Sequence, residues 1–275
     1  MILYTNKCKR TIKEFLDYYK LSKTNIYKLV MMGLVKVNGE IVKSKDVIIN
    51  ENDKVEIDDY KLKGGKYIPW NINIDVLYED EDILIVYKPR GMLVHPDSNT
   101  NNTLVNAVSY YFRGKNIVFE HLHRLDKETF GMVVFSKNIL AHAYLSYLWE
   151  NHQVKKYYIA LCYGHFKENK GEINLKIGSD RHSNKQIIFK NGSDAKTMYS
   201  VVSEKNGISK LKVEIIGGRR HQIRLHLSSI KHPILGDKLY GINDCYDKMM
   251  LEFYKIEFIH PRTQELFTFE IKQEF

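Results

Sequence analysis

The sequence is poor in cysteine. Among its 275 residues only Cys8, Cys162 and Cys245 occur, and no two of them form a CxxC pair. A small, odd-numbered and scattered set of cysteines is not the pattern of a disulfide framework or of a zinc site. Such a set is typical of a reducing compartment, and we therefore expect a cytoplasmic protein.

Long apolar runs are lacking as well. Residues 1–7 contain no continuous apolar core of signal-peptide length. No run approaches the roughly 18 apolar residues that a membrane-spanning helix needs. The sequence also contains no internal repeat, no phosphate-binding loop and no dinucleotide fingerprint. We expect no membrane partner and no cofactor.

Apolar residues and positive charge are plentiful. A hydrophobic content of 44% with 12% aromatic residues excludes a wholly disordered chain. The length suits one large domain and one small one. The net charge of +9 favours a polyanionic partner, and nucleic acid is the commonest of these.

Residues 1–60 are predicted to form a small unit. Apolar residues from Ile12 to Tyr19 recur at helical spacing, and a second helix should run from the N-cap Ser22 to Gly33. The alternating residues around Asn38-Gly39 predict a β-hairpin. Over residues 1–45, ten Lys and Arg oppose three acidic residues, a net charge of +7. The positive charge of this unit is therefore concentrated in its first 45 residues.

Residues 61–71, with Gly64-Gly65, are interpreted as a linker, and residues 72–275 as the large domain. The large domain should open with a hairpin of strands near residues 76–78 and 83–87. Further strands are predicted at 132–135, 156–164, 195–199 and 209–215, and helices at 141–149 and 221–229. We expect a monomer.

A charged loop precedes the strand at 132–135. In it, Asp126 lies between Arg124 and Lys127. Nearby cations keep a carboxylate ionised even when it is partly desolvated, so Asp126 is a candidate nucleophile or general base. Two alternatives remain at this point. Asp126 could form an ordinary surface ion pair, or it could bind a metal with His121 and His123, a set that needs further ligands such as His95, His221 or His226.

Several segments resemble, in order, the motifs of the RluA-type RNA pseudouridine synthases. Residues 123–131 resemble the HRLDxxTSG signature, with Phe130 where the family usually has Ser. Residues 218–227 and 232–241 resemble the elements GRxHQIRxHL and HPIxGDxxYG. Residues 88–96 with 103–106 resemble the first motif of the family, and residues 156–164 resemble KxYxAxxxG. The last motif, at 251–261, departs from the family at Glu252 and Phe253, which replace its usual His and Ala.

The resemblance implies an α+β fold with a mixed, mostly antiparallel sheet, and an enzyme that isomerises uridine to pseudouridine in ribosomal or transfer RNA. It implies that Asp126 is catalytic, that Arg224 pairs with it, and that Tyr158 packs on the base. No metal or other cofactor is implied. We expect RNA contacts from Arg124, His123, Arg219, Arg220 and Lys88, and in the small unit from Lys23, Lys28 and Lys36.

The small unit resembles the S-four-type RNA-binding domain. The resemblance rests on residues 21–23, 33–35, 37–39 and 53–55, with Asn52 where the family usually has Gly. The alternative is a helix–hairpin unit whose lysines are simply solvated. For the whole chain, the rivals to an RNA-modifying enzyme are a non-catalytic RNA-binding protein that assists RNA folding and a metal-dependent hydrolase.

Overall fold

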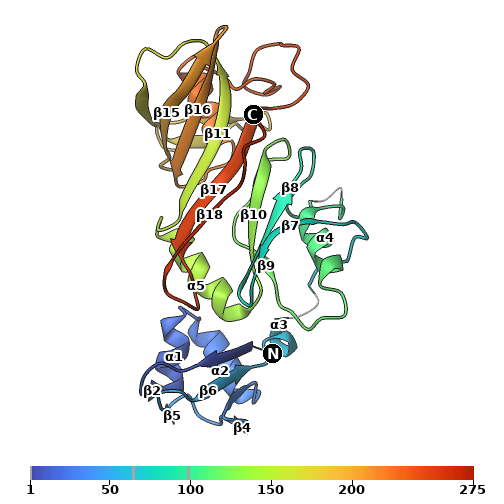
Figure 1. Ribbon diagram of the computed structural model, residues 1–275, viewed down its shortest axis with the longest axis vertical. Helices are drawn as coiled ribbons and strands as arrows, with labels where there is room; N and C mark the ends of the chain where they lie inside the picture. Colours follow the sequence, from blue (N-terminus) through green and yellow to red (C-terminus); the bar gives the residue numbers. More distant parts are fainter. Residues whose placement is uncertain (1, 64–65, 98–99) are drawn as a thin grey trace.

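A computed structural model describes residues 2–63, 66–97 and 100–275 of the chain. Figure 1 shows a small N-terminal unit beneath an elongated domain built on one large sheet. The predicted α+β architecture is confirmed, because the sheet is antiparallel throughout except where β10 (Phe130–Ser136) runs parallel to β17 (Leu251–Ile259). Within the described ranges, no helix is long and apolar enough to cross a membrane.

The N-terminal unit contains the predicted helices and hairpin. Thr11 and Glu14 form a reciprocal capping box at the start of α1, and the Ser22 side chain caps α2. Asn38 and Gly39 both have positive φ, which a tight two-residue hairpin requires. The elements are β1 (Ile2–Thr5), β2 (Arg10–Thr11), α1 (Ile12–Tyr18), α2 (Lys23–Met31), β3 (Val35–Val37), β4 (Glu40–Ile41), β5 (Ile48–Ile49) and β6 (Lys54–Ile57). The sheet order is β1-β6-β3-β4.

The predicted linker opens with a short helix, α3 (Tyr60–Lys63), and two of its residues, Gly64 and Gly65, lie outside the described residues. Beyond them, the Trp70 backbone N–H donates to the carbonyl of Asn106 in the large domain. This part of the segment is therefore fixed to the large domain.

The large sheet has the strand order β12-β15-β16-β11-β17-β10-β8-β7, with β18 paired to β17 and β9 to β10. Its order brings together strands that are far apart in sequence, above all β11, β17 and β10. The remaining strands are β7 (Asp75–Glu79), β8 (Ile83–Lys88), β9 (Glu120–His121), β11 (Lys155–Tyr163), β12 (Lys170–Asn174), β15 (Lys196–Lys205), β16 (Ile208–Ile216) and β18 (Leu266–Glu270), and β13 (Ile177–Ser179) pairs with β14 (Gln186–Ile188).

Three helices matter for the arrangement of the large domain. Both α5 (Ile139–Glu150) and α6 (Gln222–Ser229) agree with the predicted helices to within two residues at each end. The sequence analysis predicts no helix at α4 (Leu104–Tyr111), whose first residues belong to the first family motif. In Figure 1, α5 lies between the large sheet and the N-terminal unit.

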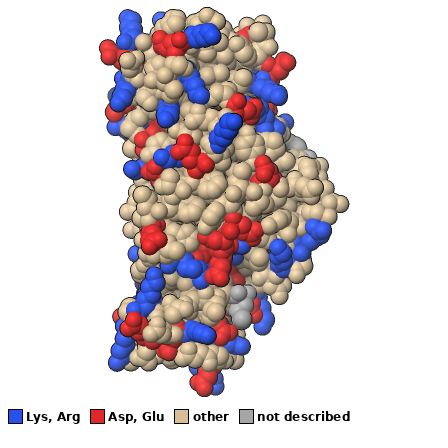
Figure 2. Space-filling view, viewed as in Figure 1, with Lys and Arg blue, Asp and Glu red and all other residues tan. Residues whose placement is uncertain are grey.

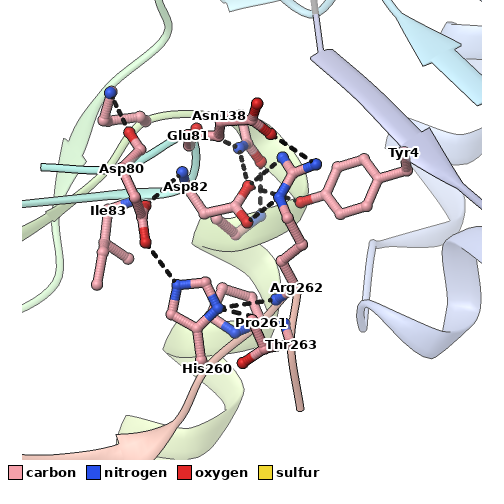
Figure 3. A network of polar contacts seen from close by, with 12 residues as sticks. Tyr4, Asp80, Glu81, Asp82, Ile83, Asn138, His260, Pro261, Arg262 and Thr263 are labelled. Atoms are coloured by element: carbon pink, nitrogen blue, oxygen red, sulfur yellow. Dashed lines mark hydrogen bonds and ion pairs between the residues drawn. The ribbon is translucent and has the colours of Figure 1, made fainter. Parts of the chain in front are cut away.

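A buried polar network joins the two parts of the molecule (Figure 3). The Asp82 carboxylate is fully buried and accepts hydrogen bonds from Tyr4 Oη at 2.8 Å and from Arg262 Nε at 2.7 Å and Nη2 at 2.9 Å. Arg262 Nη1 also donates to the Leu3 carbonyl at 2.7 Å, and its guanidinium lies 4.0 Å from the centre of the Tyr4 ring. Asp59 accepts from the Ile139 backbone N–H at 2.9 Å. The N-terminal unit is thus bound to the large domain by direct contacts.

Candidate active site

Asp126 lies in the loop between β9 and β10, with its side chain 19% exposed. Gly131, the second residue of β10, has φ +110°, and an added Cβ there would collide with the backbone of Phe253. Only glycine permits this close approach of β10 to β17. It brings the end of the Asp126 loop against the strand that also pairs with β11.

Arg224 on α6 contacts the Asp126 carboxylate. Its Nη1 lies 3.1 Å from Asp126 Oδ2, while Nε and Nη2 bind the two oxygens of Asp237 at 2.8 and 2.7 Å. Both Arg224 and Asp237 are buried. Burial alone would lower the pKa of the guanidinium, but hydrogen bonds and charge from Asp237, and then from Asp126, outweigh burial and raise it. Arg224 therefore stays charged and binds two carboxylates at once.

Asp237 is a site residue that the sequence analysis missed. It also accepts from the backbone N–H groups of Leu239 and Tyr240, at 2.9 and 3.1 Å. Burial would raise the pKa of Asp237, but the Arg224 guanidinium and these N–H groups hold it below its usual value. The signal was present in the GD pair of the HPIxGDxxYG element, although nothing in the sequence connects it to Arg224.

Tyr158 on β11 lines the same hollow as Asp126 and Arg224. Its ring stacks on Phe253 with 4.7 Å between the ring centres, and it is 6% exposed. Burial, and then the negative charge of Asp126, raise the pKa of the Tyr158 hydroxyl, which stays protonated. An aromatic ring fixed beside a carboxylate can pack against a flat heterocycle held there.

Two departures from the family pattern lie close to this hollow. Phe253 stacks on the Tyr158 ring. It also contacts the His123 ring edge-on, with 5.2 Å between the ring centres. Phe130 contacts the Arg90 guanidinium, 3.2 Å from the ring centre, and Arg90 in turn binds Glu274 at 2.8 Å. These substitutions therefore belong to the packing that holds both ends of the Asp126 loop.

The histidines of the loop do not converge on Asp126. The His123 ring lies between Trp149 and Phe253, and its Nε2 accepts from the Val134 backbone N–H at 3.1 Å. Burial lowers the pKa of His123 to about 3, so the ring is neutral. His121 stacks on His95 instead. Among the described residues, no group of three or more His, Cys, Asp or Glu side chains could hold a metal ion.

The predicted RNA contact of His123 stays a prediction, but it would not be a contact of a charged group. A neutral ring enclosed between two aromatic residues, with Nε2 engaged by the backbone, offers no cation to a phosphate. The neighbouring Arg124 is exposed, as are Arg219 and Arg220 before α6. Figure 2 shows that Lys and Arg side chains also project from the N-terminal unit and from the opposite end of the molecule. In the N-terminal unit Lys23 and Lys28 are exposed, and Lys36 is partly buried.

The prediction that Lys88 contacts RNA is wrong, because its side chain is fully buried. Nζ donates to the carbonyls of Pro89 at 3.0 Å, Met92 at 2.8 Å and Lys127 at 3.0 Å. Burial lowers the pKa of Lys88 to about 7. Three acceptors match the three donors of an ammonium group, and one acceptor belongs to the residue after Asp126. Lys88 thus ties the Asp126 loop to the turn after β8.

We expect Lys88→Met to lower the free energy of unfolding by about 2–4 kcal/mol, because it leaves buried carbonyls without donors. Urea denaturation should show this loss. The matched control is Lys127→Met, which changes an exposed side chain on the same loop and should shift stability by less than about 0.5 kcal/mol. Equal stability of the two variants would contradict the role assigned to Lys88.

Comparisons with known proteins place this chain in a class of RNA-modifying enzymes. Residues 82–229 match the family described as RNA pseudouridylate synthase. An RNA pseudouridine synthase of Bacillus subtilis (strain 168) is 36% identical over 91% of this chain and 85% of its own length. The ribosomal large subunit pseudouridine synthase D of Buchnera aphidicola is 34% identical over 88% of this chain and 80% of its own.

A solved structure agrees with these sequence comparisons. The human RNA pseudouridylate synthase domain containing 1 superposes with a TM-score of 0.64 and 26% sequence identity, covering 74% of this chain and 84% of the human chain. The chain belongs to the RNA pseudouridylate synthase family, in its RluA-like branch, and is an RNA pseudouridine synthase. Enzymes of this family act on RNA.

Proposed function

We propose that this enzyme converts particular uridines of large-subunit ribosomal RNA to pseudouridine, acting as a cytoplasmic monomer with Asp126 as its catalytic carboxylate and without a cofactor. Transfer RNA is the second candidate substrate. The observation that carries the proposal is the contact of Arg224 with Asp126 at 3.1 Å in a hollow that Tyr158 also lines. The similarity to a ribosomal large subunit pseudouridine synthase supports the choice of RNA.

The reaction breaks the glycosidic bond, turns the uracil and rejoins it to the sugar through carbon. No electron and no phosphoryl group is transferred, so the chemistry needs only groups that the chain itself supplies. A carboxylate beside the sugar can attack it, stabilise a cationic sugar or accept a proton, as in glycosidases. Arg224 would keep Asp126 ionised and oriented, and Tyr158 would pack against the uracil.

The target base must leave its stack before it reaches Asp126, at a cost of a few kcal/mol. Arg124 is exposed and lies two residues from the catalytic carboxylate. Its planar guanidinium is suited to fill the gap left by the base or to hold a phosphate. Arg219 and Arg220 would hold further phosphates at the start of α6.

For the N-terminal part we propose an RNA-binding unit of the S-four type over residues 1–60, a linker over 61–71 and a catalytic domain over 72–275. Support comes from the capped helices, the hairpin at Asn38-Gly39 and the exposed Lys23 and Lys28. This unit would add phosphate contacts and so help to select the substrate.

Removal of two lysines tests this surface. We expect the double variant Lys23→Ala/Lys28→Ala to bind RNA more weakly and with a shallower dependence on salt. Each lost phosphate contact should lower the log–log salt slope by about 0.7 on single strands and about 0.9 on duplex. The control pair is Lys167→Ala/Lys205→Ala, which changes exposed lysines between β11 and β12 and at the end of β15. Figure 1 shows β11 and β15 in the part of the large domain farthest from the N-terminal unit. An unchanged slope for the first pair would remove Lys23 and Lys28 from the RNA surface.

The rival function is RNA binding without catalysis. It predicts RNA affinity but no release of tritium from RNA labelled at C5 of uracil, whereas the proposed function predicts release by the wild type and none by Asp126→Asn. Mapping of pseudouridine in RNA from cells with and without the protein then identifies the modified position. Tritium release therefore tests the activity, and the mapping identifies the uridine on which it acts.

A further inference from the structure

His221 combines a strained backbone with a side chain directed at the candidate catalytic carboxylate. It lies just before α6 in the left-handed region, with φ +57° and ψ +17°. Residues other than glycine seldom adopt this conformation. The side chain is 9% exposed, and Nε2 lies 3.9 Å from Asp126 Oδ1.

The Tyr240 hydroxyl and the Asp126 carboxylate together favour one tautomer of His221. The Tyr240 hydroxyl oxygen accepts from the Gln186 backbone N–H at 2.5 Å, and it lies 2.9 Å from His221 Nδ1. Its own O–H proton can therefore be donated to Nδ1, which leaves the proton of the neutral ring on Nε2. The opposite tautomer would turn the Nε2 lone pair toward a carboxylate oxygen, and the two would repel each other. The Nε2–H group thus faces Asp126.

The two oxygens of Asp126 then have different neighbours. Oδ2 accepts from Arg224 Nη1 at 3.1 Å, whereas Oδ1 faces His221 at 3.9 Å. The second distance is longer than a hydrogen bond, so the imidazole attracts Oδ1 without engaging its lone pair. Arg224 therefore holds the carboxylate at Oδ2, and His221 orients it at Oδ1. Oδ1 is the oxygen that remains available for reaction.

We propose that His221 is a positioning residue for catalysis, one that orients Asp126 through its Nε2–H group while the Tyr240 hydroxyl maintains the required tautomer. The inference rests on the proposed function, in which Asp126 is the catalyst. It assigns to the histidine of the GRxHQIR element, and to the tyrosine that follows Asp237 by three residues, a joint role in presenting one carboxylate oxygen to the substrate.

Protonation of His221 should switch this arrangement off. The charged and titratable groups around the ring are Asp126 and Asp237, Arg224 and Arg220, and the Tyr240 hydroxyl. Burial, with help from the two arginines, holds the pKa of His221 below its usual value against the opposing effect of Asp126. The ring is therefore neutral at pH 7. As the pH falls through this lowered pKa, an imidazolium forms, pairs with Oδ1 and makes it unavailable.

The test compares His221→Gln and His221→Leu in single-turnover assays at saturating enzyme across the pH range. Glutamine keeps an N–H donor that does not titrate, whereas leucine removes the donor. We expect His221→Leu to slow turnover about tenfold or more, because the Asp126 carboxylate loses a group that orients it toward the substrate, with little change in RNA affinity. His221→Gln should recover most of the rate and lose the part of the acid limb that comes from His221. Tyr240→Phe should slow turnover less than His221→Leu.

His182→Leu is the matched control, because it changes an exposed histidine and should leave rate and pH profile unchanged. Wild-type rates and an unaltered acid limb in a folded His221→Leu would overturn the role of His221. If that variant does not fold, an acid limb retained in full by His221→Gln overturns it equally. Neither result touches the proposed function, which instead fails if the wild type releases no tritium or Asp126→Asn remains active.

Discussion

Asp126→Asn should abolish pseudouridine formation and leave RNA binding intact. Asparagine has nearly the same shape, but it can neither attack the sugar nor accept a proton from it. We expect the single-turnover rate to fall at least about 10²–10⁴-fold, the range for loss of a proton-transfer group. Folding should persist, because Arg224 keeps its two hydrogen bonds to Asp237.

Tritium release from C5-labelled RNA measures the rate, and a filter-binding titration measures the affinity. Glu128→Gln provides the control, since Glu128 is an exposed carboxylate on the same loop and its loss should leave catalysis near the wild-type level. Removal of a negative charge should not weaken the binding of a polyanion. Tritium release near the wild-type rate from Asp126→Asn would end the assignment of Asp126 as catalyst.

Arg224→Met should cripple both catalysis and stability, since Arg224 binds Asp126 and Asp237 together. Asp237 is fully buried, and loss of one partner of a buried ion pair costs roughly 3–5 kcal/mol. We also expect at least a tenfold loss of single-turnover rate, because Asp126 loses its hydrogen-bond donor. Lysine should restore only part of both losses, since a point charge cannot reproduce the fork that binds two carboxylates.

Asp237→Asn keeps this experiment informative if Arg224→Met does not fold. It leaves Arg224 in place and paired with Asp126. The shape of residue 237 is retained, whereas the charge is lost and one acceptor oxygen becomes an amide donor, so we expect a folded protein with a slower turnover. Urea denaturation, single-turnover rates and RNA affinity are measured on the same samples. If Arg224 bound phosphate instead, its replacement would reduce affinity and salt slope while the rate at saturating enzyme stayed normal.

Local patterns predicted much of the fold. Helical spacing and the Ser22 cap predicted α1 and α2, and Asn38-Gly39 predicted the β3–β4 hairpin, because these signals act over a few residues. The parallel pairing of β10 with β17 joins segments more than 100 residues apart, and no local pattern encodes it.

The candidate site was likewise predictable only in part. Motif resemblance pointed to Asp126, Arg224 and Tyr158, which the structure places around one hollow. Lys88 was misread because its environment is set by carbonyls up to 39 positions away, which only the folded chain brings together. Asp237 was missed because its pairing with Arg224 depends on how the loop after α6 turns back over the helix.

The junction at Tyr4, Asp82 and Arg262 gives the proposed function a geometric consequence (Figure 3). An RNA-binding unit on a free tether could reach many positions around the active site, whereas one fixed against α5 reaches only one. The N-terminal lysines and Asp126 would then contact the RNA at two points a fixed distance apart. A uridine would be selected by its spacing from a second feature of the folded RNA, and the nucleotides between them could vary freely.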